Sequence, residues 1–302
     1  MEVTESSAMQ KIVPFNANAE HNRGGKELKI GSILVSRGLL TTAQVNSILA
    51  AQEGTDRRFG EIAVRKGLVK QKDVDDALRL QFGYSTEVTA DVKLPPSLVA
   101  ANNASSPFVE ALRGLRGQLL LRWFDGTPGQ SALAVTSVDR GDGKSFIIAN
   151  LAIVFAQLGE QTLVVDGDLR HPTQHKIFNI RNQMGLSGIL SGRANLDEIR
   201  QIPGIPNLSV LPAGPLPPNP QELLGRPQFG ELLDLFSSRY NVILVDTPSA
   251  QEAADAHVVA QRTRAVIIVG RKDKTRSSEL AQLAGIFSGS GVQILGATLN
   301  SI

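Results

Sequence analysis

Two glycines, a lysine and a serine occur in one short stretch at a spacing that could bind phosphate groups. Within residues 134–152, an apolar run leads into Gly141 and Gly143, which are followed by Lys144, Ser145 and a second apolar run. The glycines allow a tight turn whose backbone N–H groups point at one anion. The lysine adds positive charge for β- and γ-phosphates, and the serine hydroxyl suits Mg²⁺. The pattern therefore predicts a phosphate-binding loop between a buried strand and a helix.

The match to the full loop pattern is incomplete. Val138 stands where that pattern has a glycine, five positions before Gly143. The sequence therefore indicates a deviant form of the loop. Taken alone, Gly-x-Gly-Lys-Ser is also compatible with an ordinary surface turn. Acidic residues that follow later apolar runs favour the phosphate loop.

Three aspartates follow apolar runs of strand length. Asp166 and Asp168 come after one run, and Asp246 ends another. Carboxylates at strand ends can hold the water molecules of a bound Mg²⁺, so Ser145, Asp168 and Asp246 are the candidate metal site. Asp166 is the candidate to accept a proton from a phosphoryl acceptor such as a tyrosine phenol, whose pKa is about 10. One such aspartate alone would favour a helix cap, whereas the three together favour function.

Alternating strands and helices are needed to bring these residues together. Apolar runs of strand length occur around 134–138, 161–168, 240–246, 265–270 and 294–300, separated by helical segments. This alternation predicts an α/β fold with a doubly wound, mostly parallel sheet. Ligands of such sheets bind at the carboxyl ends of the strands, which is where the phosphate loop and the three aspartates come in the sequence.

The composition is that of a globular chain with two domains. The 302 residues are 42% hydrophobic, contain no cysteine and carry 31 basic against 29 acidic residues. Disulfides, thiolate nucleophiles and cysteine zinc sites are excluded, and the small charge excess gives no case for nucleic-acid binding. No apolar run approaches the roughly 20 residues that span a bilayer. We expect a cytoplasmic protein that reaches the inner membrane only through a partner.

An internal repeat precedes the α/β region. Residues 29–52 recur as 58–81 at a constant offset of 29, each copy with a short helix, a glycine stop and a second amphipathic helix. We expect a disordered leader at 1–27, a small all-α tandem-repeat domain at 28–84, a linker at 85–104 and the α/β domain at 105–302, with boundaries set by runs of proline, asparagine and serine.

The repeat resembles the MshEN domains of type II secretion and type IV pilus ATPases, which bind cyclic di-GMP. The length of each copy and the five-residue spacer match, whereas Lys29 replaces the first arginine of the family motif. The resemblance implies a cyclic di-GMP site at Lys29, Gly31, Arg58 and Gly60. A second interpretation stays open, in which the repeat is a helical docking module whose glycines only pack helices.

The α/β region resembles the bacterial tyrosine kinases of capsule and exopolysaccharide synthesis, the BY-kinases. The stretch 137–145 matches their Walker A motif, 165–172 their Walker A′ motif and 244–248 their Walker B motif, and 211–224 matches a further family signature. The resemblance implies catalytic roles for Lys144, Asp166 and Asp168. It also implies that ATP is bound along one stretch, Arg140, Gly141, Asp142, Gly143, Lys144, Ser145 and Phe146.

The related MinD and ParA ATPases share the expected P-loop NTPase fold, but they carry a lysine five residues before the loop lysine. Asp139 occupies that position in this sequence, which disfavours a positioning ATPase. The motif Glu110-x-x-Arg113-x-x-Arg116 matches the one through which BY-kinases form rings, so we expect a homo-oligomer. The alternative is an ordinary solvated helix face.

The sequence therefore predicts an ATP- and Mg²⁺-dependent protein-tyrosine kinase that regulates polysaccharide chain length and export, under cyclic di-GMP control if the repeat binds it. The expected partner is a transmembrane, Wzz-like polysaccharide co-polymerase. The family's tyrosine cluster is absent after Asn300, and Tyr84 and Tyr240 are the two tyrosines. We therefore expect no tail autophosphorylation. The alternative function is a catalytically weak, ATP-binding adaptor of the co-polymerase.

Overall fold

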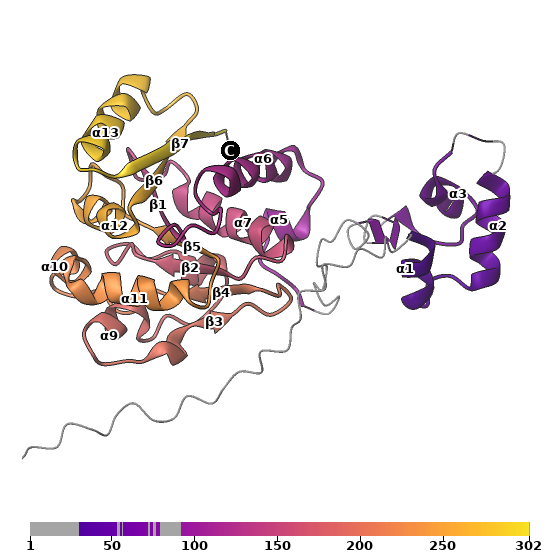
Figure 1. Cartoon of the computed structure of the whole chain (residues 1–302), viewed down its shortest axis with the longest axis horizontal. Coiled ribbons are helices and arrows are strands. Elements are labelled where there is room, and N and C mark those ends of the chain that lie inside the picture. The colour runs from indigo at the N-terminus through magenta and orange to yellow at the C-terminus, as the bar shows by residue number, and fades with distance from the viewer. Residues whose placement is uncertain are drawn as a thin grey trace, which may run out of the picture. The chain divides into compact units, whose positions relative to one another are not determined.

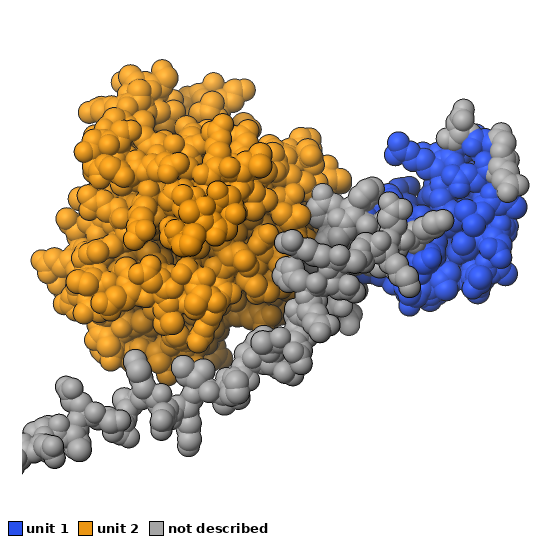
Figure 2. Space-filling model, in the orientation of Figure 1, with its two compact units in different colours: residues 1–81 blue, residues 82–302 orange. Residues whose placement is uncertain are grey.

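The computed structural model describes residues 30–52, 55, 57–71, 73–74, 77–78 and 92–301. The chain divides into two compact units, residues 1–81 and 82–302, which Figure 2 shows in blue and orange. The predicted leader, Lys29 and Tyr84 lie outside the described residues.

The described part of the first unit is helical. Its elements are α1 (Ile30–Ser36), α2 (Thr42–Gln52) and α3 (Phe59–Arg65), with further helical residues between positions 71 and 78. Side chains from both copies of the repeat form one apolar core, which includes Leu34, Ile48 and Ala63, each fully buried. Two helical segments per copy thus share one core.

The two copies end their first helices with the same local structure. Gly38 and Gly67 have φ values of +68° and +67°, in the left-handed region that favours glycine as a helix stop. Three residues later the backbone N–H groups of Thr41 and Lys70 each donate, at 2.8 Å, to the side chain three positions further on. Equivalent hydrogen bonds in the two copies are therefore 29 residues apart, which is the offset of the sequence repeat.

The second unit contains a seven-stranded sheet in the order β3-β4-β2-β5-β1-β6-β7. Its strands are β1 (Ala132–Ser137), β2 (Thr162–Asp166), β3 (Arg200–Gln201), β4 (Leu208–Leu211), β5 (Val242–Asp246), β6 (Ala265–Arg271) and β7 (Gln293–Asn300). All neighbours are parallel except β3 and β4. The predicted α/β fold with a mostly parallel sheet is confirmed, and β3 and β4 add two short strands that the sequence analysis does not anticipate.

Helices cover both faces of this sheet, as Figure 1 shows. One face carries α5 (Val99–Asn102), α6 (Pro107–Arg122) and α7 (Lys144–Gln157). The other carries α9 (Gly185–Leu190), α10 (Pro220–Gly225), α11 (Pro227–Ser237), α12 (Asp255–Thr263) and α13 (Ser277–Gly289). A short α-helix, α8 (Gln174–Ile177), and a 3₁₀ helix, η1 (Leu196–Glu198), complete the unit.

Alternate residues of the central strands enter opposite cores. Leu133 and Val135 pack on the α7 side, whereas Ala132 and Ala134 pack on the α12 side. A strand buried on both faces is apolar throughout, which is why the sequence shows continuous apolar runs here. Among the described residues, no helix has both the length and the apolar character to cross a bilayer.

The linker predicted over 85–104 is wrong for its described part, 92–104. Ala100 is fully buried, and its N–H donates to Oδ1 of Asn150 at 2.9 Å. The amide nitrogen of the same asparagine donates to the carbonyl oxygen of Ser97 at 3.0 Å. Proline, asparagine and serine suit free linkers and tight turns alike, so composition alone could not show that this stretch packs on α7.

Helix α6 begins as its sequence predicts, with the Ser106 side chain accepting from the N–H of Val109 at 3.3 Å. The motif Glu110-x-x-Arg113-x-x-Arg116 is expected to mediate contacts between copies of the chain, but one of its three residues does not reach the surface. The Arg116 side chain is buried and donates to the carbonyl oxygen of Val154.

This contact has a clear structural purpose. Val154 is one of the last four residues of α7, whose carbonyls lack partners within the helix and attract a cation. Arg113 instead forms an ion pair with Glu110, in which Nη1 and Oε2 are 2.9 Å apart. The exposed fraction is 22% for the arginine side chain and 73% for the glutamate side chain. Arg116 therefore holds α6 on α7, and the ion pair of Glu110 and Arg113 is the part of the motif that solvent reaches.

We expect Arg116→Met to lower the free energy of unfolding by about 1–3 kcal/mol, because a buried carbonyl loses a charged donor. Arg113→Ala should change it by less than about 1 kcal/mol, since its ion pair lies at the surface. Urea denaturation of the two variants makes the comparison. Equal stabilities would show that Arg116 has no role between α6 and α7.

Candidate functional site

The predicted phosphate loop lies between β1, in the middle of the sheet, and the first turn of α7. Gly141 and Gly143 have φ values of +88° and +93°, which L side chains rarely adopt. A Cβ atom on Gly143 would also lie 2.0 Å from Nδ2 of Asn300. Both the turn and the close approach of Asn300 therefore require glycine here. Helix α7 starts at Lys144, so its unpaired N–H groups come directly after the loop.

Lys144 and Asp168 lie side by side in this site. Their Nζ and Oδ2 atoms are 3.8 Å apart, and both side chains are less than a tenth exposed. The other carboxylate oxygen of Asp168 accepts from the N–H of His171 at 2.9 Å, which fixes its orientation. The structure thus brings together two predicted catalytic residues that are 24 positions apart in the sequence.

Asp166 and Asp246 are paired in register across β2 and β5, and both are fully buried. Oδ2 of Asp166 accepts from the N–H groups of Thr173 and Gln174 at 3.0 and 2.9 Å. Oδ2 of Asp246 accepts from the Gln174 side chain at 2.8 Å. Oδ1 of each aspartate is buried and has no hydrogen-bond partner.

Burial disfavours the charged form of both carboxyl groups. It raises the pKa of Asp166 well above its usual range, and the nearby Asp246 carboxylate raises this pKa further. Burial also raises the pKa of Asp246, although Lys144 and hydrogen bonds from Ser145 and Gln174 oppose the shift. Positive charge brought next to this pair would therefore be stabilised.

The site fits a divalent cation with oxygen ligands. The two unpartnered Oδ1 atoms are acceptors of the kind that hold Mg²⁺ or its water shell. The Ser145 side chain is near enough to Asp246 to lower the pKa of that carboxyl group, against the effect of burial. Within the described ranges no three acidic, histidine or cysteine side chains form a complete metal-binding group. Phosphate oxygens and water would therefore have to supply the remaining ligands.

Gln174 is a residue of this site that the sequence analysis missed. It is fully buried, and its Nε2 donates to Asp246 and also to the carbonyl oxygen of Ser145 at 3.1 Å. It therefore connects the start of α7 to the ends of β2 and β5. A glutamine six residues after Asp168 belongs to no chemical pattern, so only the fold reveals it.

The remaining loop residues have different surroundings. The Asp142 carboxylate is fully buried and accepts from the N–H of Asp139 at 3.0 Å. The ring of Phe146 stacks on Phe108 of α6, with centroids 5.3 Å apart. Arg140 is exposed. The side chains of Asp142 and Phe146 are thus engaged within the protein, and their backbone N–H groups remain for phosphate.

The candidate residues of the first unit include two glycines at helix contacts. A Cβ atom on Gly31 would lie 3.1 Å from Cγ1 of Val45, and one on Gly60 would lie 2.4 Å from Cγ1 of Val74. Helix packing therefore explains both glycines without a ligand. Arg58 is exposed.

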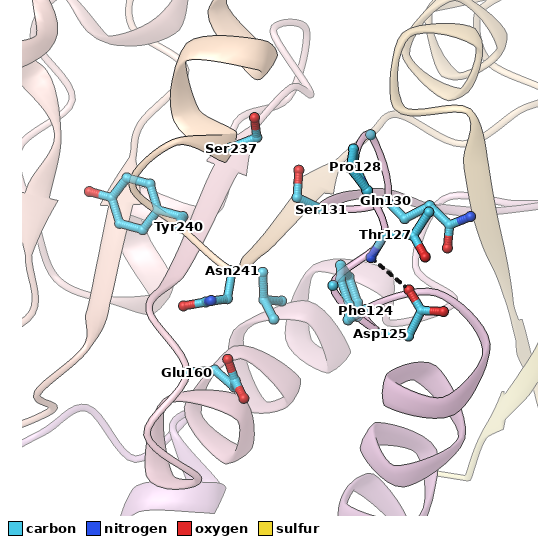
Figure 3. Close-up of a pocket in the computed structure, with 13 residues that line it drawn as sticks. Phe124, Asp125, Thr127, Pro128, Gln130, Ser131, Glu160, Ser237, Tyr240 and Asn241 are labelled. Atoms are coloured by element: carbon cyan, nitrogen blue, oxygen red, sulfur yellow. Dashed lines mark hydrogen bonds between the residues drawn. The ribbon is translucent and has the colours of Figure 1, made fainter. Parts of the chain in front are cut away.

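A separate hollow lies at the other edge of the sheet (Figure 3). Its cavity volume is about 380 Å³, and its lining includes Ser131 and Asn241, which directly precede β1 and β5. The phosphate loop follows the opposite, carboxyl end of β1. This hollow is therefore not part of the nucleotide site, and its lining Tyr240 packs edge-on against Phe236, with ring centroids 6.5 Å apart.

No protein-family model matches the chain. It is 34% identical over 206 residues to the tyrosine-protein kinase CapB of Staphylococcus aureus, covering 68% of this chain and 89% of that protein. It is also 34% identical over 205 residues to the tyrosine-protein kinase Wzc of Salmonella typhi, of which it spans only 28%.

The chain also resembles solved structures. The chimerical protein CapA2B2 superposes with a TM-score of 0.64 at 35% identity, over 70% of this chain and 92% of that one. The kinase domain of Escherichia coli ETK superposes with a TM-score of 0.64 at 32% identity, over 68% and 80%. The cell division ATPase MinD of Pyrococcus furiosus, at 24% identity, has a TM-score of 0.50 over 56% and 71%. This last likeness shows the fold alone.

The buried aspartate pair should make the protein less stable as the pH rises. Because the folded-state pKa of Asp166 lies above its unfolded value, the folded chain binds more protons, and the free energy of unfolding falls as the pH increases above the ordinary aspartate pKa. Asp166→Asn replaces the titrating carboxyl group with a neutral amide of similar size. We expect Asp166→Asn to have a higher melting temperature than the wild type at pH 7, by about 2–4 °C for each kcal/mol gained in the free energy of unfolding. We also expect its melting temperature to change less with pH.

Melting curves between about pH 4 and pH 8 span the range above the ordinary aspartate pKa and test this expectation. Asp234→Asn, at an exposed position of α11, is the matched control. A lower melting temperature for Asp166→Asn at pH 7, with the wild-type pH slope retained, would contradict it.

Proposed function

The chain belongs to the family of bacterial tyrosine kinases of capsule and exopolysaccharide synthesis, and on this basis we propose that it transfers the γ-phosphoryl group of ATP to a tyrosine of a partner protein. The observation that carries the proposal is the convergence of Lys144, Asp168, Asp166 and Asp246 at the carboxyl edge of the sheet, directly beside the glycine loop. We further propose that this transfer regulates polysaccharide chain length and export.

The residues of the site have separate tasks in this reaction. Backbone N–H groups from Gly141 to Ser145 bind phosphate oxygens, and Lys144 neutralises charge on the β- and γ-phosphates. Ser145, Asp168 and Asp246 would hold Mg²⁺, which supplies positive charge against the phosphates.

Asp166 is the proposed proton acceptor. The tyrosine oxygen forms a bond to the γ-phosphorus as the bond from phosphorus to the β-bridging oxygen breaks, giving ADP, and the phenol proton passes to a carboxylate. Oδ1 of Asp166 has no hydrogen-bond partner, and the raised pKa of this residue makes it a stronger base than an exposed aspartate.

The proposed activating partner is a transmembrane polysaccharide co-polymerase, which would hold the chain at the inner membrane. The chain resembles the chimerical protein CapA2B2, whose name joins two proteins, and this likeness supports a second polypeptide as partner. We propose Glu110 and Arg113 of α6 for contacts between copies of the chain, since both reach its surface.

Lys144→Met should weaken ATP binding at least tenfold, because phosphate loses a charge-assisted hydrogen bond. The fold should stay intact, since Asp168 keeps its bond from the His171 N–H. Calorimetry with ATP and Mg²⁺ measures binding, and transfer from labelled ATP, with and without the co-polymerase tail, measures the reaction. The control is Lys176→Met, an exposed position of α8.

The outcomes separate two functions. Binding and transfer that Lys144→Met abolishes would support the kinase. Binding without transfer, even with the partner tail, would favour the ATP-binding adaptor. Unchanged ATP affinity in Lys144→Met would overturn the assignment of the phosphate loop.

We propose cyclic di-GMP as a second ligand, bound by the MshEN-like region 28–84. The supporting observation is that Leu49 and Leu78, equivalent residues of the two copies, remain 47% and 36% exposed. Apolar surface repeated at equivalent positions suits a ligand with two equivalent halves, and the exposed guanidinium of Arg58 can make bidentate contacts to guanine or phosphate.

Titration of the full chain with cyclic di-GMP tests this second site. Arg58→Ala should reduce binding more than Lys29→Ala, because an ammonium group cannot make the bidentate contact. Arg57→Ala, directly before the second copy of the motif, is the control. Absence of binding at micromolar concentration would favour the docking module.

A further inference from the structure

Three side chains at or just after the ends of β6 and β7 donate to three consecutive carbonyl groups of the phosphate loop. Nζ of Lys274 donates to the carbonyl of Arg140 at 3.1 Å, an Arg271 guanidinium nitrogen to that of Gly141 at 3.3 Å, and Nδ2 of Asn300 to that of Asp142 at 3.1 Å. We call Arg271, Lys274 and Asn300 the loop brace. The first two lie at and after the end of β6, and the third ends β7.

The brace fixes the direction of the loop's N–H groups. In a planar trans peptide, the carbonyl of one residue and the N–H of the next point to opposite sides. The carbonyls of residues 140, 141 and 142 are all held toward the brace. The N–H groups of Gly141, Asp142 and Gly143 therefore point away from it, as an anion-binding turn requires.

Lys274 also compensates a charge that would oppose nucleotide binding. Its Nζ lies 3.5 Å from Oδ1 of Asp142, whose side chain has no solvent exposure, whereas 43% of the lysine side chain is accessible. A buried carboxylate inside a phosphate-binding loop repels phosphate unless a cation offsets it. The lysine therefore acts on the loop twice, through the Arg140 carbonyl and through this carboxylate.

The turn after β6 is itself well defined. The N–H of Arg271 donates to the Thr275 hydroxyl at 2.7 Å, and the N–H of Thr275 returns to the Arg271 carbonyl at 2.9 Å. Asp273 has a φ of +62°, in the left-handed region. Lys272 donates through its N–H to the Asn300 carbonyl at 2.8 Å, which joins the turn to the end of β7.

From this geometry we infer that Arg271, Lys274 and Asn300 are positioning residues of the nucleotide site, and that Lys274 raises nucleotide affinity by holding the Arg140 carbonyl outward and neutralising Asp142. The inference rests on the proposed binding of ATP to this loop. It assigns to the β6–α13 turn, which the sequence motifs do not include, a direct effect on the affinity for nucleoside phosphates.

Calorimetric titration of the full chain with ADP tests the assignment. Lys274→Met should weaken ADP binding about tenfold, as expected when a charged donor is lost, while Lys274→Arg should retain most of the affinity. The matched control, Lys272→Met, changes an exposed lysine two positions away whose backbone alone makes the contact to Asn300.

A double-mutant cycle separates positioning from a general structural effect. In an Asp142→Asn background, Lys274→Met should weaken ADP binding by only about threefold, because the charge to be compensated is gone. The inference would be overturned if Lys274→Met lost no more ADP affinity than Lys272→Met. It would also be overturned if Lys274→Met lost as much ADP affinity in the Asp142→Asn background as in the wild type.

A measurement without nucleotide keeps the inference separate from the proposed function. Hydrogen exchange of the amides of residues 140–143 should be faster in Lys274→Met than in the wild type and in Lys272→Met. If the wild type does not bind ADP, the proposed function fails, and the exchange rates alone decide whether the brace orders the loop. Equal exchange in all three proteins would refute the brace.

Discussion

The burial of two aspartates side by side at the ends of β2 and β5 is the constraint on which the site depends. Asp166 and Asp246 occupy equivalent positions of neighbouring strands, and neither side chain reaches solvent. Such a pair is unfavourable unless hydrogen bonds and cations compensate it. The N–H groups at the start of α8, the Gln174 side chain and Lys144 provide that compensation here.

The same constraint explains why these elements meet at one edge. Gln174 contacts the start of α7 and both strands through three hydrogen bonds, so β2, β5 and α7 cannot shift independently. Lys144 begins α7 and approaches Asp168 within 3.8 Å. The cost of burying like charges is thus balanced locally, and a bound cation would reduce it further. A site of this kind is stabilised by its ligand.

The phosphate loop depends on a second, outer set of contacts. On its inner side the loop presents N–H groups, whose direction follows from carbonyls that Arg271, Lys274 and Asn300 hold outward. The requirement for glycine at position 143 has the same origin, because Asn300 occupies the space of a Cβ atom. The ends of β6 and β7 therefore hold the phosphate loop in place although they carry none of the recognised motifs.

The sequence by itself determined the α/β fold, the family and the residues at the carboxyl edge of the sheet. Strands buried on both faces and a glycine loop each give a pattern within one continuous stretch of residues, so they can be recognised without knowing what packs against them. Tertiary structure alone decided four other matters. Arg116 is buried against Val154, residues 92–104 pack on α7, Gln174 joins the aspartates, and the brace reaches the loop from 130 to 158 positions away. These contacts join residues distant in the chain whose types suit many environments. Only the packed fold determines which environment each one occupies.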